Sequence, residues 1–439
     1  MKQKRTYFYS IFTIALCLAL ALEAFGQGRN IEKTYRWTYK VNSDVSLEFN
    51  NYDCDLTIHT WDKAEIAYAM SVDATLKTEE DARRLDGYIE ELEFSHSVGS
   101  VKFDNRFWTS KKAIMGKKTM TLKGEKTIRF SEFKMNGEMW IPENCRLNIS
   151  SKYSEIEVGE LNGRVSLDLY NDKVFGKGVN GNMEIAAKYS TMEFADMKDI
   201  KADLYNTTLE AGDIGSLSVV SKYSRIETGN AGKVDIDAYS DKYAFGVTGD
   251  IRFIDKYSDL DAEQTEHTEL DCYNSTVNIT RLDDVELKSK YGSYNFEEAD
   301  KLSISSAYSD KFTIDKLGVL NVTDSKYSVY KLGHLENSIF LEEGYSDKIF
   351  VEESGSLKEV KLSGKYLVLE MALDNELSYR FKADVKYPKF ELMEESMDVR
   401  RKIKEGSDLK MEAIKGTESE GMPSFFVNGY EMAVTLTEQ

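Results

Sequence analysis

The sequence predicts an all-β protein, most of it a single-stranded β-solenoid, or β-helix, with about 17 residues per tyrosine repeat. Three observations lead to this prediction: a recurring tyrosine, alternating apolar runs between the tyrosines, and turn-forming breaks between the runs. The tyrosines recur 16 to 21 residues apart from about residue 148 to residue 371. They are Tyr153, Tyr170, Tyr189, Tyr205, Tyr223, Tyr239, Tyr257, Tyr273, Tyr291, Tyr308, Tyr327, Tyr345 and Tyr366.

Short segments between the tyrosines alternate apolar and polar residues, as in residues 165–169 and 234–238. Alternation with a period of two residues is the signal of a half-buried strand. Breaks such as Asn162-Gly163 and Asn180-Gly181 supply turns. No segment of this region carries a long apolar pattern of helical period, so we do not expect helical repeats. We therefore expect strand coils that stack on one another and share one core.

The tyrosines fall into two alternating classes. In the lysine class, lysine precedes the tyrosine and a small residue usually follows, as in Ser221-Lys222-Tyr223-Ser224. In the second class Asn or Ser follows, as in Leu169-Tyr170-Asn171-Asp172-Lys173. The apolar residues before the two classes differ in phase, so we expect the lysine class to point inward and the second class to lie at a bend or face solvent. The alternation leaves open whether one turn holds about 17 residues or about 35.

Composition places this chain among folded proteins without a nucleic-acid partner. It has 439 residues, of which 41% are hydrophobic, 12% are aromatic and only 3 are proline. Its net charge is −19, from 57 basic and 76 acidic residues. Binding to nucleic acid requires clustered positive charge, so this acidic balance argues against it.

The amino-terminal residues predict export. Residues 1–26 combine a basic start, an apolar run over residues 11–22 and small residues before Gln27, which are the parts of a cleaved signal peptide. The apolar run is too short for a membrane-spanning helix. We expect no transmembrane segment after signal cleavage, and a location in the periplasm or outside the cell, including the cell surface.

Residues 27–147 predict a strand-rich amino-terminal domain. One helix is expected over residues 79–92, since an acidic first turn precedes an apolar face. Strands are expected at 46–49, 55–58, 98–104, 119–122, 127–133 and 138–141. Residues 102–134 hold ten Lys or Arg and three acids. This basic segment suits an acidic polymer or anionic lipid head groups, but a lysine-rich hairpin whose charges keep an exposed edge soluble is the favoured interpretation.

Residues 148–371 form the predicted solenoid and residues 372–439 its carboxy-terminal cap, because an open solenoid end needs covering. Strands are expected at 377–385 and 430–436, with a charged loop over 394–420. Cys54, Cys145 and Cys272 remain after signal cleavage, and an odd number of cysteines does not indicate a disulfide framework. Cys54 with Cys145 is the single pairing considered.

Several residues carry a resemblance to a known family: Phe49-Asn50-Asn51-Tyr52-Asp53, Trp61-Asp62-Lys63 and the Lys-Tyr-Ser repeats. Together they resemble the bacterial β-strand-repeat family of unknown function, of the head-domain type, whose members are often labelled adhesins and are frequent in Bacteroidota. The resemblance covers most of the mature chain. It implies an exported β-solenoid with a head region and no established activity.

The sequence offers no candidate for catalytic, cofactor-binding or metal-binding residues. Its four histidines are far apart, and no nucleophile elbow, phosphate loop or zinc-protease motif occurs. An Asp-Lys pair recurs beside second-class tyrosines: Asp172-Lys173, Asp241-Lys242, Asp310-Lys311 and Asp347-Lys348. Catalysis needs one distinct constellation, so a structural ladder of alternating charge with hydroxyl and amide hydrogen bonds is favoured over glycan binding and over catalysis.

If the second-class tyrosines are exposed, they form an aromatic stripe suited to sugar rings. The residues of this predicted stripe are Tyr170, Tyr205, Tyr239, Tyr273, Tyr308 and Tyr345. We therefore expect a non-catalytic envelope protein without a cofactor that binds a glycan or an envelope protein in the manner of an adhesin. A periplasmic accessory of an envelope-sensing system and, less favoured, a polysaccharide-active enzyme are the alternatives.

Overall fold

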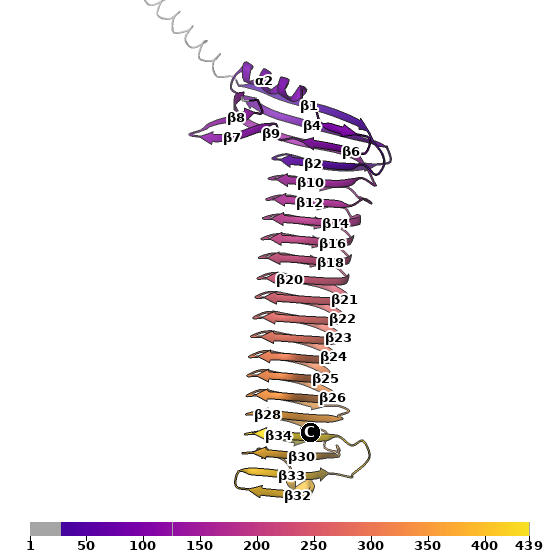
Figure 1. Ribbon diagram of the computed structural model, residues 1–439, viewed down its shortest axis with the longest axis vertical. Helices are drawn as coiled ribbons and strands as arrows, with labels where there is room; N and C mark the ends of the chain where they lie inside the picture. Colours follow the sequence, from indigo (N-terminus) through magenta and orange to yellow (C-terminus); the bar gives the residue numbers. More distant parts are fainter. Residues whose placement is uncertain (1–27, 125, 439) are drawn as a thin grey trace, which may run out of the picture. The chain divides into compact units, whose positions relative to one another are not determined.

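The computed structural model describes residues 28–124 and 126–438, and most of them belong to β-strands (Figure 1). Two compact units divide the chain between Asn180 and Gly181. The all-β class and the β-solenoid are confirmed. The predicted signal peptide, residues 1–26, lies outside the described residues. Within the described part of the chain, no helix is long and apolar enough to cross a membrane.

Unit 1 begins with an antiparallel sheet covered by one helix. Strand β1 (Arg29–Lys40) pairs with β4 (Glu65–Leu76), and β4 pairs with β9 (Thr127–Pro142). Helix α2 (Glu79–Glu90) follows β4, and the side chain of Thr78 caps it by accepting the backbone N–H of Asp81. The helix buries Leu85 and Ile89. The helix predicted at 79–92 is therefore confirmed, two residues shorter.

The first coil of unit 1 lies far upstream of the others in sequence. Its strands, β2 (Ser46–Tyr52) and β3 (Asp55–Trp61), pair in parallel with β10 (Arg146–Lys152) and β11 (Glu155–Val158). The chain thus leaves the stack after one coil, completes the antiparallel sheet that β1 began, and returns with Leu147 beside Leu47. The remaining strands of unit 1 are β5 (Ser95–Ser97), β6 (Ser100–Asp104), β7 (Trp108–Ile114), β8 (Lys117–Leu122), β12 (Val165–Tyr170) and β13 (Lys173–Gly176).

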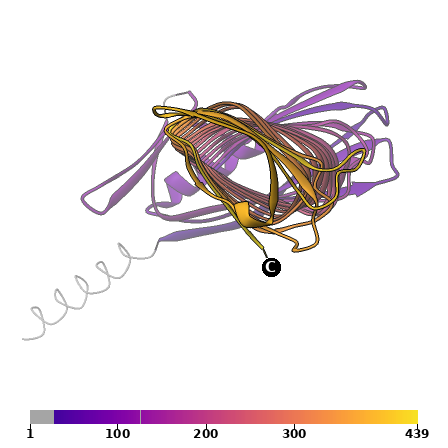
Figure 2. The ribbon, with the colours of Figure 1, turned by 90° about the horizontal axis from the view of Figure 1, so that it is seen from below.

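Unit 2 is a stack of parallel coils. Its early coils each hold a long and a short strand, and its middle coils a single strand of 15 to 17 residues that bends around the turn. In Figure 2 these coils overlie one another along the stack. The strands are β14 (Val179–Lys188, which contains the division between the units), β15 (Thr191–Phe194), β16 (Met197–Tyr205), β17 (Thr208–Ala211), β18 (Ile214–Lys222), β19 (Arg225–Thr228), β20 (Ala231–Tyr239), β21 (Lys242–Lys256), β22 (Asp259–Tyr273), β23 (Thr276–Lys290), β24 (Ser293–Tyr308), β25 (Lys311–Lys326), β26 (Val329–Tyr345), β27 (Lys348–Ser354), β28 (Glu359–Lys365) and β29 (Val368–Leu373).

The strand register fixes the length of one turn. Lys222 pairs with Tyr239, and Tyr239 pairs with Lys256, a step of 17 residues in each case (239 − 222 and 256 − 239). One turn of the solenoid therefore holds one tyrosine repeat, and the alternative of about 35 residues is excluded. The two tyrosine classes belong to alternate coils, not to two corners of one longer coil.

The core of unit 2 consists of columns of inward side chains in register. In one column Tyr294, Phe312 and Tyr330 are each at most 1% exposed. The rings of Phe312 and Tyr330 stack 4.7 Å apart at 1°. Burial of one such side chain stabilises the fold by about 1.5–3 kcal/mol relative to its exposure. The apolar alternation seen in the sequence is this inward face.

The carboxy-terminal strands do not stack in chain order. Strand β34 (Ser424–Tyr430) lies between β28 and β30 (Tyr379–Lys386), and β35 (Ala433–Glu438) lies between β29 and β31 (Lys389–Glu391). Antiparallel strands β33 (Asp408–Lys415) and β32 (Met397–Glu405) follow beyond β30. The loop predicted over 394–420 is therefore wrong for β32 and β33 and correct only for the short 3-10 turn η1 (Glu394–Ser396), the turn at residues 406–407 and residues 416–420. Its charges belong to β32, an outer strand exposed along almost its whole length.

Candidate functional site

One turn of every coil brings the tyrosines together, and we call this turn the tyrosine corner. Each strand ends there on a Lys or a Tyr, and the next residue takes left-handed backbone dihedral angles. In unit 2 the φ of these left-handed residues is 48° to 68°. They are Tyr189, Asn206, Tyr223, Ser240, Tyr257, Asn274, Tyr291, Ser309, Tyr327, Ser346, Tyr366, Tyr387 and Glu431. A tyrosine in this region is strained, so surrounding contacts must hold it there.

The tyrosine rings form a ladder in each unit. Across the thirteen rings of unit 2, neighbouring centroids lie 5.3–5.9 Å apart and the ring planes meet at 73–88°. In unit 1, Tyr153 makes the same edge-to-face contact with Tyr52 and with Tyr170. Such pairs contribute about 0.5–1.5 kcal/mol each beyond the area they bury.

The two tyrosine classes differ by one residue in position along the coil. In the lysine class, Lys222 ends its strand and Tyr223 is the left-handed residue, with φ 57°. In the second class, Tyr239 itself ends the strand and Ser240 is left-handed, with φ 59°. The backbone N–H of Tyr223 donates to the carbonyl of Tyr239 in the next coil. This shift of one residue turns successive rings nearly perpendicular to each other.

The expectation that the lysine class points inward is wrong. Tyr223 is 46% exposed, whereas second-class Tyr239 is 37% exposed. The strand phase differs between the classes because the left-handed residue reverses the side on which the next side chain lies. Of the predicted stripe, Tyr170, Tyr239 and Tyr273 are 37% exposed, and Tyr205, Tyr308 and Tyr345 are half-buried. All six lie at the corner and alternate with lysine-class rings.

Lysines add positive charge to this aromatic surface. The ammonium group of Lys222 lies 4.8 Å from the ring centroid of Tyr223 and 4.6 Å from that of Tyr239. In unit 1 the Lys152 ammonium lies 5.7 Å from the Tyr170 centroid. A cation in this position is attracted to the face of the ring. A lysine ends the strand in alternate coils, so the corner carries cations at regular intervals in a chain of net charge −19.

Behind the corner lies a buried polar network. Asp347 is fully buried, and its Oδ1 accepts the Ser325 hydroxyl at 2.9 Å and the Ser328 N–H at 2.8 Å. Its Oδ2 accepts the N–H of Tyr345 at 2.9 Å. Asp172, Asp241 and Asp310 accept the equivalent set in their own coils.

Burial disfavours the charged form of these carboxyl groups. It raises the pKa of Asp172 and of Asp347 to about 6, although hydrogen bonds from backbone N–H groups offset part of the rise. It also raises the pKa of Asp241, Asp255 and Asp310. The predicted hydroxyl and amide hydrogen bonds are therefore confirmed. The predicted ladder of alternating charge is wrong, because each aspartate turns inward while the lysine after it is exposed.

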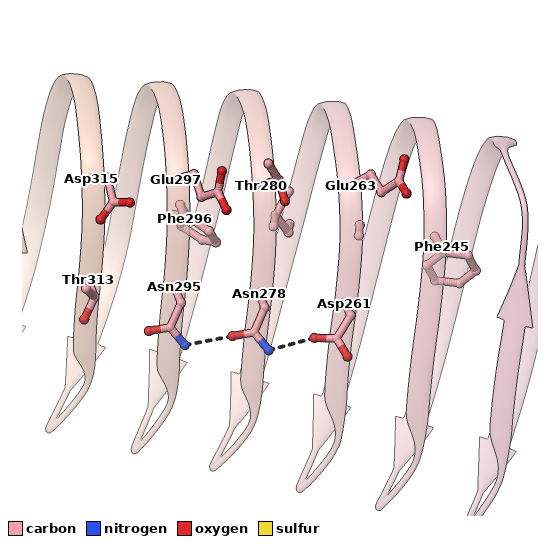
Figure 3. A pocket seen from close by; sticks show the side chains of 12 residues that line it. Phe245, Asp261, Glu263, Asn278, Thr280, Asn295, Phe296, Glu297, Thr313 and Asp315 are labelled. Carbon is pink, nitrogen blue, oxygen red and sulfur yellow. Dashed lines mark hydrogen bonds between the residues drawn. The ribbon is translucent and has the colours of Figure 1, made fainter.

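A shallow groove of about 430 Å³ lies over the outer face of five coils of unit 2, from β21 to β25. Figure 3 shows Asp261, Asn278 and Asn295 in one line, joined by amide hydrogen bonds of 2.7 and 2.8 Å. A second line in Figure 3 holds Glu263, Thr280, Glu297 and Asp315. These side chains occupy repeated positions on successive coils, unlike the single constellation that catalysis needs, and all are exposed except half-buried Asn278.

The basic segment and the cysteines singled out from the sequence do not come together in one site. Residues 108–122 form an antiparallel hairpin, β7–β8, as the favoured interpretation predicted. Cys54, Cys145 and Cys272 are buried free thiols, so the considered pairing of Cys54 with Cys145 does not form. Among residues 28–124 and 126–438, no three His, Cys, Asp or Glu side chains are grouped to hold a metal ion.

Sequence reasoning missed three members of the ladder. Tyr52 begins it in unit 1, and Tyr430 and Tyr387 end it in unit 2. Lys386-Tyr387 repeats the lysine-class motif, so its signal was present in the sequence. Tyr52 and Tyr430 are followed by Asp53 and Glu431 in place of the Asn or Ser of the second class, so the motif did not mark them. The amide line of the groove was also missed, although Asp261, Asn278 and Asn295 are 17 residues apart.

Comparisons with known proteins add little to this geometry. No family model matches this chain, and no curated protein matches it. One similar solved structure is a "putative cell adhesion protein" from Clostridium sporogenes, 10% identical, covering 94% of this chain and 100% of its own, with a TM-score of 0.17. Another is a "putative lipid binding protein" from Parabacteroides distasonis, 12% identical, covering 77% of this chain and 96% of its own, with a TM-score of 0.16. At these TM-scores neither structure bears on the function of this chain.

Proposed function

We propose that this chain is a non-catalytic, adhesin-like exported protein whose tyrosine corner binds an extended glycan. The observation that supports the proposal most is the ladder itself. Rings lie 5.3–5.9 Å apart along unit 2, and most are 37–48% exposed. Monomeric proteins seldom expose aromatic side chains in one continuous line, and such patches usually mark an interaction surface.

The arrangement of the rings suits sugars. In an edge-to-face pair one ring covers the face of the other and keeps its own faces free. In the ladder, alternate rings therefore have faces that no neighbouring ring covers. Equivalent rings recur at every second coil, a distance of two strand spacings of about 4.8 Å, which is close to the advance of two sugars in an extended 1,4-linked chain. A linear glycan can therefore meet an equivalent ring at every second sugar.

The lysines at the corner indicate the preferred class of glycan. The Lys222 ammonium lies against two rings and remains at the surface, where it can pair with a carboxylate of the ligand. An acidic linear polysaccharide therefore fits the corner better than a neutral one. Repetition supports a non-catalytic role, because ring and lysine recur along the stack and a buried Asp, Thr or Ser lies behind each second-class ring of the predicted stripe.

Affinity gel electrophoresis tests this proposal. The mature chain is run in native gels that contain polygalacturonate, xylan or no polysaccharide. We expect retardation by polygalacturonate, and a much smaller effect for the triple variant Tyr205→Ala/Tyr239→Ala/Tyr273→Ala. The matched control is Val247→Ser, which removes an apolar side chain that is 45% exposed outside the ladder. Equal retardation of the triple variant and the wild type would exclude the corner as the binding surface.

A further inference from the structure

A hairpin with an apolar tip extends from unit 1. In β7–β8, Ile114 pairs with Lys117, which leaves Met115 and Gly116 as a two-residue loop. Their φ values are 48° and 76°, the pattern of a type I′ turn. Figure 1 shows the hairpin projecting beyond the edge of the antiparallel sheet of unit 1. Residues 111–118 are all exposed.

The tip residues contradict local preference. Type I′ turns favour Asn, Asp or Gly where both central residues have positive φ, and methionine is poorly suited to the first position. Met115 is nevertheless there, 99% exposed, beside Ile114 at 63%. Neither turn conformation nor burial within the fold explains these two side chains. Large apolar groups placed against local rules indicate a surface that is covered by something else.

The sides of the hairpin are strongly basic. Residues 105–124 contain six Lys or Arg and no acid, in a chain of net charge −19. Lys111 serves the fold, because its ammonium pairs with Asp53 at 2.5 Å and lies 5.0 Å from the ring centroid of Phe133. Lys112, Lys117 and Lys118 make no ion pair with any carboxylate of the described residues. The Lys118 ammonium donates one hydrogen bond to the Ser131 carbonyl oxygen at 2.9 Å, which does not neutralise its charge, so all three lysines next to the tip can still pair with an external anion.

We propose that this hairpin docks onto an anionic lipid bilayer. Ile114 and Met115 enter the interface between head groups and acyl chains, while Lys112, Lys117 and Lys118 pair with lipid phosphates. An apolar insertion and a basic cluster together give stable membrane attachment, whereas either signal alone gives weak attachment. The rest of the chain is acidic and is repelled by the same surface, so docking is expected hairpin first. This inference is independent of the tyrosine corner.

Vesicle co-sedimentation of the mature chain tests the proposal. We expect binding to vesicles of equimolar phosphatidylcholine and phosphatidylglycerol, and little binding to phosphatidylcholine alone. Met115→Asn is the decisive variant, because it creates an Asn-Gly loop that suits the type I′ turn. It should melt at or above the wild-type temperature yet bind at least about fivefold more weakly. In the variant Lys112→Gln/Lys117→Gln/Lys118→Gln, the affinity for the anionic vesicles should fall roughly fivefold for each lysine replaced.

Two controls keep the alternatives apart. Val220→Asn removes a valine that is 58% exposed in unit 2 and should bind vesicles as the wild type does. Polygalacturonate replaces the vesicles in a parallel titration, because an acidic polysaccharide also suits the lysines. Wild-type vesicle affinity in Met115→Asn, equal binding to neutral vesicles, or no vesicle binding would each overturn the proposal. Absence of vesicle binding together with polysaccharide binding that falls in the triple-lysine variant, whose tyrosine corner is intact, would assign the lysines to that polymer instead.

Discussion

Replacement of Asp347 should remove a defined part of the pH dependence of stability. This carboxyl group is fully buried, and burial raises its pKa to about 6 from an ordinary value of 3.8. That difference corresponds to about 3 kcal/mol between the protonated and charged forms. The folded pKa lies above the unfolded one, so the stabilising contribution is complete below pH 3.8 and disappears as the pH rises through 6.

The expected magnitude follows from the two pKa values. Between pH 5 and pH 7.5, the folded state binds more protons than the unfolded state at this site. The free energy of unfolding should therefore fall by about 1.4 kcal/mol over this interval through Asp347 alone. Asp347→Asn cannot titrate and lacks this component. Its amide can still accept from Ser325 and Ser328 through one oxygen, whereas the Tyr345 N–H loses its acceptor.

Urea unfolding followed by circular dichroism at pH 5 and pH 7.5 measures the effect as a double difference. From pH 5 to pH 7.5, the free energy of unfolding of the wild type should fall by about 1.4 kcal/mol more than that of Asp347→Asn. Asp237→Asn, an exposed position in the same unit, should follow the wild type. Identical pH dependence in the wild type and Asp347→Asn would refute the argument that burial holds this group in its protonated form.

Three further predictions concern the backbone and the thiols. Asn206 is left-handed, with φ 48°. In urea unfolding Asn206→Val should therefore be about 1–2 kcal/mol less stable than Asn206→Gly. Equal stability of the two variants would contradict the left-handed backbone at this position. Gly364→Ala should lower the free energy of unfolding by at least about 2 kcal/mol, since the new Cβ would lie 2.2 Å from the Gly344 carbonyl oxygen. Gly99→Ala is the control, because open space surrounds that position. An unchanged stability of Gly364→Ala would mean that the coils can separate there. Cys54, Cys145 and Cys272 should resist iodoacetamide in the native chain, because burial raises the pKa of each thiol, to about 12 for Cys54 and Cys145. Peptide mapping by mass spectrometry identifies the alkylated cysteines. Rapid alkylation of any of the three thiols in the native chain would contradict their burial.

The repeat was predictable because every coil obeys the same local rules. Apolar alternation marks the inward columns, and a tyrosine marks each turn. The orientation of the two classes was not predictable, since it depends on left-handed residues such as Tyr223 and Ser240. Sequence propensity does not place a tyrosine in that region, because ring contacts between coils compensate the strain.

The ends of the stack depend on pairings between distant residues. Leu47 pairs with Leu147 although β4, α2 and β9 lie between them in sequence. Strand β34 inserts between β28 and β30, an order that no local pattern encodes. The sequence of strand β32 predicts a loop, because this charged strand lies at the exposed edge and buries almost no side chain. In both regions non-local pairing overrides the local signal.

Nitration footprinting tests the binding role of the tyrosine corner most directly. Tetranitromethane is applied to the native chain with and without polygalacturonate, and the modified tyrosines are mapped by mass spectrometry. Fully buried Tyr243, Tyr294 and Tyr330 should stay unmodified in both samples, and half-buried Tyr88 on α2 should react equally in both. We expect the polysaccharide to protect several consecutive corner tyrosines, such as Tyr223, Tyr239 and Tyr257. Unchanged nitration along the ladder under conditions of demonstrated binding would place the ligand elsewhere and contradict the proposal.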